Sequence, residues 1–143
     1  MNETNWLWRP RVVVAEDCEM MARTISRIVQ LHCDVVRVVR DGQTAIDAVL
    51  ELQPDVLVLD IQMPVLDGIQ VVRRLRALNG KSRIVMLTGY EDQQFIDASI
   101  IAGANGFVFK SRMTGDLLRA IGEVLAERTF VSKHSRWGTG EPL

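Results

Sequence analysis

Residues 54–68, with the sequence PDVLVLDIQMPVLDG, decide the fold of this chain of 143 residues. Within them, the run 55–60 is apolar between its two aspartates and rich in Val and Leu, as expected of a strand buried on both faces of a sheet. The run ends on the carboxylate of Asp60, and the chain then turns through Met63 and Pro64. We therefore expect a buried strand that carries an acidic side chain to the edge of a sheet.

Four more runs of strand length occur, at 11–17, 34–39, 83–89 and 106–110. The segments that follow each strand carry apolar residues at helical spacing. Strands that alternate with helices in this way predict an α/β fold, with a five-stranded parallel sheet covered by five helices on its two faces. Because Arg37 interrupts its apolar run, the second strand is expected at an edge of the sheet.

The composition is that of an ordinary globular domain, with 48% hydrophobic and 24% charged residues. A formal net charge of -1 gives no reason to expect direct binding of nucleic acid. The sequence has no apolar run long enough to span a membrane and no signal peptide at its start. Cys18 and Cys33 do not make a disulfide framework, so we expect a reduced, cytoplasmic protein.

The length of the chain suits one domain. We place that domain at residues 11–127, with an N-terminal tail at 1–10. Residues 128–143 lack periodicity and end in turn-forming residues, which predicts a C-terminal tail or the start of a linker.

Acidic residues follow two strands of the predicted sheet. Glu16 and Asp17 end the first strand, and Asp60 ends the third. The carboxyl ends of parallel strands lie at one edge of a sheet, where neighbouring strands are about 4.8 Å apart. Three acids at this spacing repel one another unless a cation compensates, and Mg²⁺ prefers carboxylate oxygens. The sequence therefore predicts a magnesium site at this edge.

The fourth and fifth strands bring groups that suit an anion to the same edge. Thr88 offers a hydroxyl, Gly89 leaves the backbone open to close approach, and Lys110 brings a positive charge. A tetrahedral anion held beside a carboxylate indicates phosphoryl transfer, with Asp60 as the residue that receives the group.

These residues lie in four blocks, VVVAED (12–17), VLVLDIQMPVLDG (56–68), VMLTGY (85–90) and AGANGFVFK (102–110). In order and spacing the blocks resemble the receiver domain of bacterial two-component response regulators, including the chemotaxis receivers and the receivers that precede a helix-turn-helix domain. The resemblance implies a flavodoxin-like sheet with strand order 2-1-3-4-5.

The resemblance also implies roles for the acidic residues. Asp60 matches the phosphoacceptor, which takes its phosphoryl group from a sensor histidine kinase or a phosphotransfer protein. Asp17 matches a direct ligand of Mg²⁺, and Glu16 matches an acid that usually acts through water. The backbone carbonyl of Gln62 matches the third protein ligand.

Other positions match residues that respond to the phosphoryl group. Thr88 and Lys110 match the hydroxyl and the lysine that bind it, and Phe107 matches an aromatic side chain whose inward or outward position reports the state. The residues that match those shaping the site are Pro64, Gly68, Gly89 and Tyr90. The resemblance further implies a signalling domain without enzymatic activity beyond its own phosphorylation and dephosphorylation, and a homodimer through the face from the fourth to the fifth helix.

Two departures from the family pattern bear on the site. Glu16 stands where most relatives have Asp, which lengthens its reach by one methylene. Ser111 follows Lys110 where many relatives have a proline joined by a cis bond; a cis Lys-Ser bond would cost about 3 kcal/mol, so a trans bond is expected.

Smaller features complete the expectations. Asp41 and Asp67 are expected to start helices. Ile101 is expected to point outward from the fourth helix, and His32 and His134 are expected at the surface.

Two alternatives to an isolated receiver stay open. An Mg²⁺-dependent phosphatase with an aspartate nucleophile would share the chemistry, although such enzymes carry an acid two residues after the nucleophile, where this chain has Gln62. A truncated transcriptional regulator would lack its DNA-binding domain, and residues 128–143 contain no helix-turn-helix.

Overall fold

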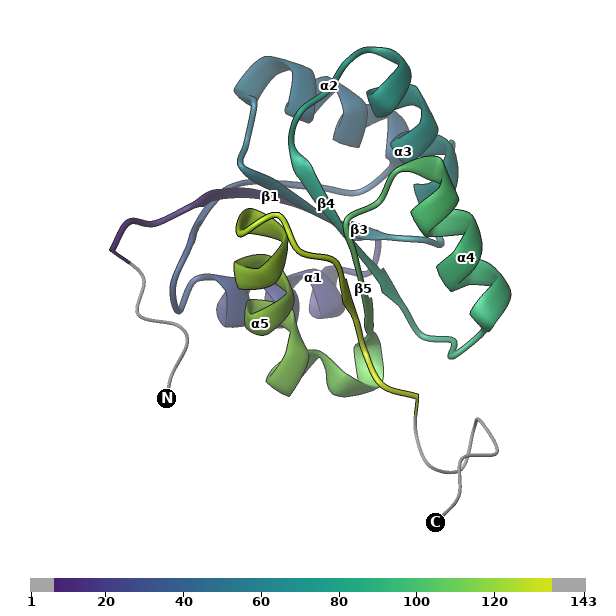
Figure 1. The fold of residues 1–143 in the computed structure, drawn as a ribbon. Helices are drawn as coiled ribbons and strands as arrows, with labels where there is room; N and C mark the ends of the chain where they lie inside the picture. Colours follow the sequence, from purple (N-terminus) through teal and green to yellow (C-terminus); the bar gives the residue numbers. More distant parts are fainter. Residues whose placement is uncertain (1–6, 135–143) are drawn as a thin grey trace.

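A computed structural model describes residues 7–134 of the chain, which form a parallel sheet in the order β2-β1-β3-β4-β5-β6 (Figure 1). The strands are β1 (Arg11–Ala15), β2 (Asp34–Val39), β3 (Val56–Asp60), β4 (Arg83–Thr88), β5 (Gly106–Phe109) and β6 (Phe130–Val131). The helices are α1 (Glu19–Val29), α2 (Gly42–Leu52), α3 (Gly68–Ala77), α4 (Gln93–Ala102), the short 3-10 helix η1 (Lys110–Arg112) and α5 (Met113–Leu125).

Helices cover both faces of the sheet. Figure 1 shows α1 and α5 on one side and α2, α3 and α4 on the other. Successive residues of a strand point to opposite faces, so β3 supplies Leu57 and Leu59 to the core under α2 and α3, and Val56 and Val58 to the core under α1 and α5. The continuous apolar run of the sequence therefore fills two cores.

The predicted α/β fold and the order of the first five strands are confirmed, and β2 lies at an edge of the sheet as Arg37 indicated. All five predicted strands are present, and the structure adds a short sixth strand. Phe130–Val131 forms β6, which pairs in parallel with β5, although we had placed these residues in a C-terminal tail. Two residues give too little pattern for a strand to be predicted from the sequence.

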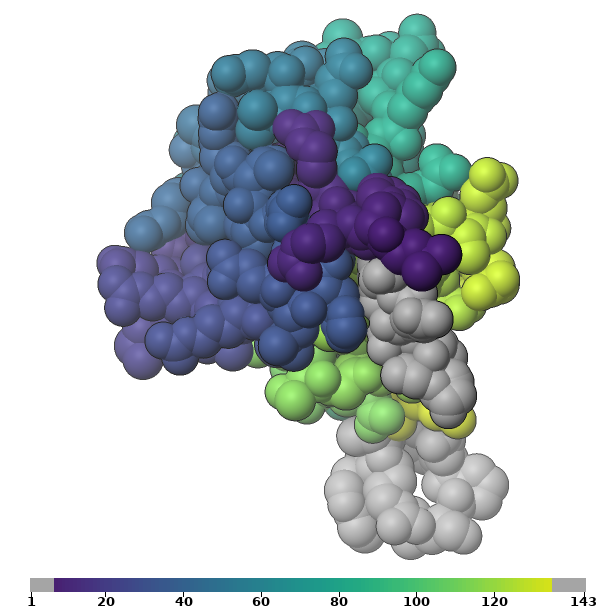
Figure 2. Space-filling model, turned by 90° about the vertical axis from the view of Figure 1, so that its left-hand side faces the viewer, coloured from purple at the N-terminus to yellow at the C-terminus, as the bar shows by residue number. Residues whose placement is uncertain are grey.

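Residues 7–10, expected in an N-terminal tail, lie against the start of β2. Arg9 donates from Nε to Asp34 (2.8 Å) and from one terminal nitrogen to the carbonyl of Cys33 (2.7 Å). Figure 2 shows this purple segment lying over blue surface that belongs to residues near β2. The other predicted tail residues, 1–6 and 135–143, lie outside the described part of the chain.

Two of the predicted helix starts are confirmed by their caps. The Asp41 carboxylate accepts a hydrogen bond from the Thr44 amide (2.8 Å), and Asp67 forms a reciprocal capping box with Gln70. Asp67 is followed by Gly68, where an added Cβ would lie 2.7 Å from the carbonyl oxygen of Asp60. Glycine at this position lets α3 begin directly against the end of β3.

Two further expectations on backbone and surface are confirmed. No cis peptide bond occurs among the described residues, so the Lys110–Ser111 bond is trans. The side chain of Ile101 is 84% exposed on α4. Between residues 7 and 134, no helix has both the length and the apolar character needed to cross a bilayer.

Candidate functional site

Three acidic side chains converge at the carboxyl edge of the sheet. β1 pairs with β3, with Ala15 opposite Leu59, so the residues that follow or end these strands are neighbours. Glu16, Asp17 and Asp60 each offer a carboxylate oxygen, and these oxygens all lie within 4.8 Å of one another. Glu16 and Asp60 are buried, with 1% and 4% of their surface exposed, whereas Asp17 is open to solvent. The cluster thus has a buried base and an open mouth.

Among the described residues, Lys110 is the one cation that forms an ion pair with these acids. It directly follows β5, and its Nζ lies 2.8 Å from Oε1 of Glu16 and 3.1 Å from Oδ2 of Asp60. Three carboxylates beside one ammonium leave an excess of negative charge. A divalent cation that binds here would neutralise this excess charge and be stabilised by it.

The ionisation of the buried pair follows from this arrangement. Burial raises the pKa of Glu16 above its ordinary value, against the opposing effect of its contact with Lys110. Burial alone would lower the pKa of Lys110, but its contacts with Glu16 and the charge of Asp60 together raise it. Lys110 therefore remains a cation at neutral pH and is held at the site by two acids.

Backbone amides fix the two buried carboxylates. The amide of Gln62 donates to Oδ1 of Asp60 (3.1 Å), and the amide of Cys18 donates to Oε2 of Glu16 (3.1 Å). Each bond spans two residues, so the loop after each strand holds the acid that precedes it. The carboxylates are held in position before any ligand arrives.

The donor set fits Mg²⁺. Glu16, Asp17 and Asp60 provide hard oxygen ligands in one cluster, and Gln62 lies two residues after Asp60, the last residue of β3. A hollow of about 520 Å³ beside the acids is lined in part by Asp17, Gln62 and Pro64. This space leaves room for the water molecules that Mg²⁺ keeps when it binds to proteins.

The loop between β3 and α3 is under backbone strain. Val65 has φ of 72°, and the amide of Leu66 donates to the carbonyl of Pro64 (2.9 Å), which closes a γ-turn around Val65. A β-branched residue rarely adopts this conformation. The Pro64 carbonyl also accepts from the amide of Gly42 (3.3 Å), so the loop is anchored to the start of α2. This strain was not predictable from the residue type, because Val is rarely found at positive φ.

Thr88 and its neighbours form the second wall of the site. Thr88 ends β4 opposite Phe109 and is buried, and its hydroxyl accepts a hydrogen bond from the amide of Tyr90 (3.1 Å). A Cβ added to Gly89 would meet no atom within 4 Å, so the backbone there faces open space. Tyr90 is exposed and lines a hollow of about 840 Å³ together with Gln62.

Phe107 points into the core. This is the inward of the two orientations, inward and outward, that the family resemblance implies for this residue. It is fully buried and packs edge-to-face on Phe109, with ring centroids 5.9 Å apart. The structure thus brings the predicted residues of β1, β3, β4 and β5 to one edge of the sheet. Their individual roles stay predictions.

A polar cluster behind this edge was not predicted. Asp116 is buried on α5, where its Oδ2 accepts from the hydroxyl of Ser132 (2.7 Å) and from Nε of Arg112 (3.2 Å). Asp116 falls on the buried stripe of α5 with Met113 and Ala120, and an acid on such a stripe is a signal that could have revealed the cluster. Ser132 carried no comparable signal.

His134 was expected at the surface, and the structure places it there with 22% of its side chain exposed. The side chain is partly buried, its ring centroid lies 5.2 Å from that of Phe109, and its Nε2 is 3.2 Å from Oε1 of Gln93. Because the residue follows β6, its position depends on a strand that the sequence did not predict.

Comparison with known proteins gives a consistent result. Residues 12–122 match the family model of the response regulator receiver domain. The transcriptional regulatory protein YvfU of Bacillus subtilis is 32% identical over 123 residues, covering 84% of this chain and 62% of YvfU. The chemotaxis protein CheY of Halobacterium salinarum is 25% identical over 115 residues, covering 80% of this chain and 96% of CheY.

A solved structure resembles most of the described fold. The signal receiver domain of the response regulator NarL from Mycobacterium tuberculosis matches with a TM-score of 0.81 and 26% identity, over 85% of this chain and 99% of that domain. The chain spans 62% of the length of YvfU and 51% of the length of the regulator LnrK, so it covers about half to three fifths of these curated relatives.

Proposed function

The chain belongs to the response regulator receiver domain family, and from this membership we propose that Asp60 is the residue that accepts a phosphoryl group in a two-component system. The observation that carries the proposal is the cluster of Glu16, Asp17 and Asp60 around the ammonium of Lys110. As a receiver, the chain is a signalling domain. The phosphoryl donor is a phosphohistidine of a sensor histidine kinase or of a phosphotransfer protein.

The transfer makes one bond and breaks one. An oxygen of the Asp60 carboxylate attacks phosphorus and forms an acyl phosphate, while the phosphorus–nitrogen bond of the donor histidine breaks and the imidazole leaves. Oδ1 of Asp60 is held by the Gln62 amide, and Oδ2 is held by Lys110. These two contacts orient the carboxylate before the donor arrives.

Mg²⁺ would be held by Asp17, Asp60 and the backbone carbonyl of Gln62, with Glu16 acting directly or through water. When bound, it offsets the negative charge of the acids and of the phosphoryl oxygens that approach them. Lys110 contributes to the same end from the side of β5. After transfer, its ammonium can exchange the Asp60 oxygen for a phosphoryl oxygen and stay paired with Glu16.

Thr88 and Phe107 report the new state. The Thr88 hydroxyl has a donor hydrogen to offer a phosphoryl oxygen, and it already accepts from the Tyr90 amide. Contacts made only with the phosphorylated form bias the chain toward an active conformation. Tyr90 and Gln62, which line one hollow, border the phosphoryl group and influence its lifetime.

Further assignments belong to the same proposal. The receiver unit comprises residues 11–127, and Pro64, Gly68 and Gly89 shape the site. Homodimers form through the face from α4 to α5, on which Ile101 is exposed. The receiver works in the cytoplasm, where sensor kinases present their phosphohistidine, and it binds no nucleic acid by itself.

The test is to incubate the full chain with acetyl phosphate and Mg²⁺ and to map the added phosphoryl group by mass spectrometry. We expect a single acyl phosphate on Asp60, and none without Mg²⁺. A cognate or promiscuous histidine kinase should serve as a second donor, so that poor use of acetyl phosphate is not mistaken for inactivity. If neither donor modifies Asp60, the proposal is wrong.

A further inference from the structure

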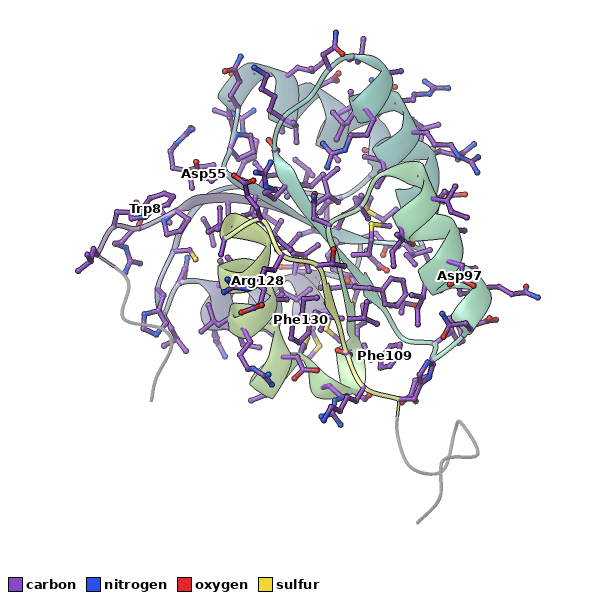
Figure 3. The ribbon with its side chains drawn as sticks, in the orientation of Figure 1. Trp8, Asp55, Asp97, Phe109, Arg128 and Phe130 are labelled. Carbon is purple, nitrogen blue, oxygen red and sulfur yellow. The ribbon has the colours of Figure 1, made fainter. Side chains whose placement is uncertain are left out.

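The chain that follows α5 returns to the carboxyl edge of the sheet. α5 ends at Leu125, Glu127 turns the backbone with φ of 63°, and residues 128–134 then run beside β5. Figure 1 shows this yellow segment descending along β5, and Figure 3 labels Arg128 and Phe130 next to α5. We name residues 128–134 the C-terminal strap.

The first half of the strap is held on α5. Arg128 forms two hydrogen bonds with the carboxylate of Glu123 (2.7 and 3.1 Å), and the guanidinium of Arg119 lies 5.5 Å from the ring centroid of Phe130. These contacts are made by elements that do not touch the acidic cluster. They fix where the strap begins.

The second half of the strap is held on β5 through Ser132. The Ser132 amide donates to the carbonyl of Phe107 (2.9 Å), and its hydroxyl accepts from the amide of Phe109 (3.2 Å) and donates to Asp116 (2.7 Å). The strap thereby covers the backbone of β5, which would otherwise be an open sheet edge. Ser132 is buried, while its neighbours Val131 and Lys133 are exposed. The attachment of the strap to β5 therefore depends largely on the hydrogen bonds of Ser132.

The end of the strap contacts β5, the loop that follows β4 and the first residue of α4. His134 packs on Phe109, its Nε2 lies 3.2 Å from Oε1 of Gln93, and its Nδ1 lies 3.8 Å from Oε1 of Glu91. His134 also lines the same hollow as Tyr90 and Gln62. The strap therefore bridges β5 and the loop at residues 89–92.

Both anchor points of this second half belong to elements that also form the candidate site. β5 carries the buried Phe107 and leads into Lys110, and the loop begins with a bond from the Tyr90 amide to the hydroxyl of Thr88. A phosphoryl group on Asp60 gives the Thr88 hydroxyl and the Lys110 ammonium a new partner. We expect movement of either group toward Asp60 to shift β5 or the loop and so to weaken their contacts with Ser132 and His134.

We propose that the C-terminal strap is an intramolecular switch that is docked in the unphosphorylated chain and released from Ser132 onward when Asp60 is phosphorylated. The proposal rests on the proposed function, because phosphorylation is its trigger. Coupling between two sites is reciprocal, so a strap that phosphorylation loosens is also a strap whose loss favours phosphorylation. Release exposes the edge of β5 and frees whatever follows residue 134.

Hydrogen exchange of the full chain tests the release. Exchange is followed by mass spectrometry with Mg²⁺ alone and with Mg²⁺ plus acetyl phosphate, and modification of Asp60 is measured in the same samples. In phosphorylated chains we expect the amide of Ser132 to exchange on the order of tenfold faster, while amides of β1 keep their rates. Equal or slower exchange at Ser132 in chains that do carry the acyl phosphate overturns the strap and leaves the proposed function standing. Absence of any phosphoryl group on Asp60 from every donor overturns both.

Two variants test the reverse direction. His134→Ala removes the contacts with Glu91 and Gln93 and should speed both the exchange of Ser132 and phosphorylation by acetyl phosphate, each severalfold. His32→Ala, three residues beyond the end of α1, is the matched control and should change neither. Ser132→Ala, which keeps the backbone bond but loses the hydroxyl, should act in the same direction. Faster strap exchange without faster phosphorylation in both variants would show that strap and site are uncoupled, and the proposal would fall.

Discussion

The two ends of the parallel sheet treat charge in opposite ways. At the amino end, the guanidinium of Arg76 donates to the carbonyls of Gly103 (3.0 Å), Gly80 (2.9 Å) and Ser82 (3.0 Å) and to Oδ1 of Asn105 (2.8 Å). Its positive charge is spread over neutral acceptors from two segments of chain, the loop between α3 and β4 and the loop between α4 and β5. Burial lowers the pKa of Arg76, which nevertheless stays charged because an arginine titrates far above neutral pH.

At the carboxyl end, charges face charges. Glu16, Asp17 and Asp60 lie together with Lys110 as the counter-charge, so acids outnumber cations. Figure 3 labels a residue near each end, Asp55 at the start of β3 and Phe109 at the end of β5. The amino end satisfies its charge with hydrogen bonds and stabilises the fold, whereas the carboxyl end keeps an excess of negative charge that can bind a cation.

Exchange of one aspartate at each end should give the largest contrast. Asp60→Asn should abolish phosphorylation, because an amide cannot form the acyl phosphate. Lys110 keeps Glu16 as a partner and one of three mutually repelling acids is lost, so the free energy of unfolding should fall by no more than about 1 kcal/mol. Phosphoryl incorporation and urea denaturation measure the two quantities.

Asp55→Asn is the matched control at the amino end. Oδ2 of Asp55 accepts from the Arg11 amide (2.8 Å), and an asparagine can still accept there. This variant should take up phosphoryl groups as the parent chain does. Phosphorylation of Asp60→Asn at a second acid to the same extent would contradict the assignment of the acceptor.

Removal of Arg76 at the amino end should lower stability and leave phosphorylation unchanged, which is the reverse of the result expected for Asp60→Asn. Arg76→Met keeps the aliphatic stem but removes the donor of three backbone carbonyls and one of the two donors to Oδ1 of Asn105, which should cost about 3 kcal/mol of unfolding free energy. Phosphorylation of the folded fraction should be unchanged. Arg73→Met, on the exposed face of the same helix, should lie within about 0.5 kcal/mol of the parent in the same denaturation experiment.

A loss of phosphorylation in folded Arg76→Met protein would show that the two ends are not separate. Equal stability of Arg76→Met and Arg73→Met would show that the hydrogen bonds of Arg76 do not hold the amino end.

The two ends also differ in what the sequence could predict. Strand length, apolar content and terminal acids were enough to place Asp17, Asp60 and Lys110 at one edge, because parallel strands must end together. The contacts of Arg76 were not predictable, since three of its four acceptors are backbone carbonyls, which leave no trace in side-chain type. The same reason hid the strap: Ser132 binds backbone groups of β5, and a strand of two residues has no period to detect.

Addition of Mg²⁺ should sharpen the comparison by stabilising one end alone. At ten times its dissociation constant, a ligand that binds only the folded chain raises the unfolding free energy by about 1.4 kcal/mol. Thermal denaturation should show this increase in the parent chain and little of it in Asp17→Asn, which loses an open carboxylate of the cluster. Asp97→Asn, on α4, keeps the cluster intact and should respond as the parent does. Equal stabilisation of all three chains would place the ion elsewhere.

Backbone strain should give the smallest difference between the two ends, measured as a change in unfolding free energy. Loops at the amino end place Gln53 and Asn79 at positive φ, 46° and 61°, where polar side chains and Asn above all are tolerated. The carboxyl end places Val65 at φ of 72° beside Pro64. Val65→Asn should therefore raise the unfolding free energy by about 1 kcal/mol, since it relieves a strain that only the site loop bears.

The matched control for Val65→Asn is Val38→Asn. Val38 is likewise an exposed valine but lies in β2, where a strand favours valine over asparagine, so this exchange should lower stability. Urea denaturation of the two variants separates the backbone effect from the loss of apolar surface that they share. Opposite signs would locate the strain at the γ-turn beside the acids. Destabilisation by both would mean that the loop fits valine well, and that the carboxyl end differs from the amino end in its charge alone.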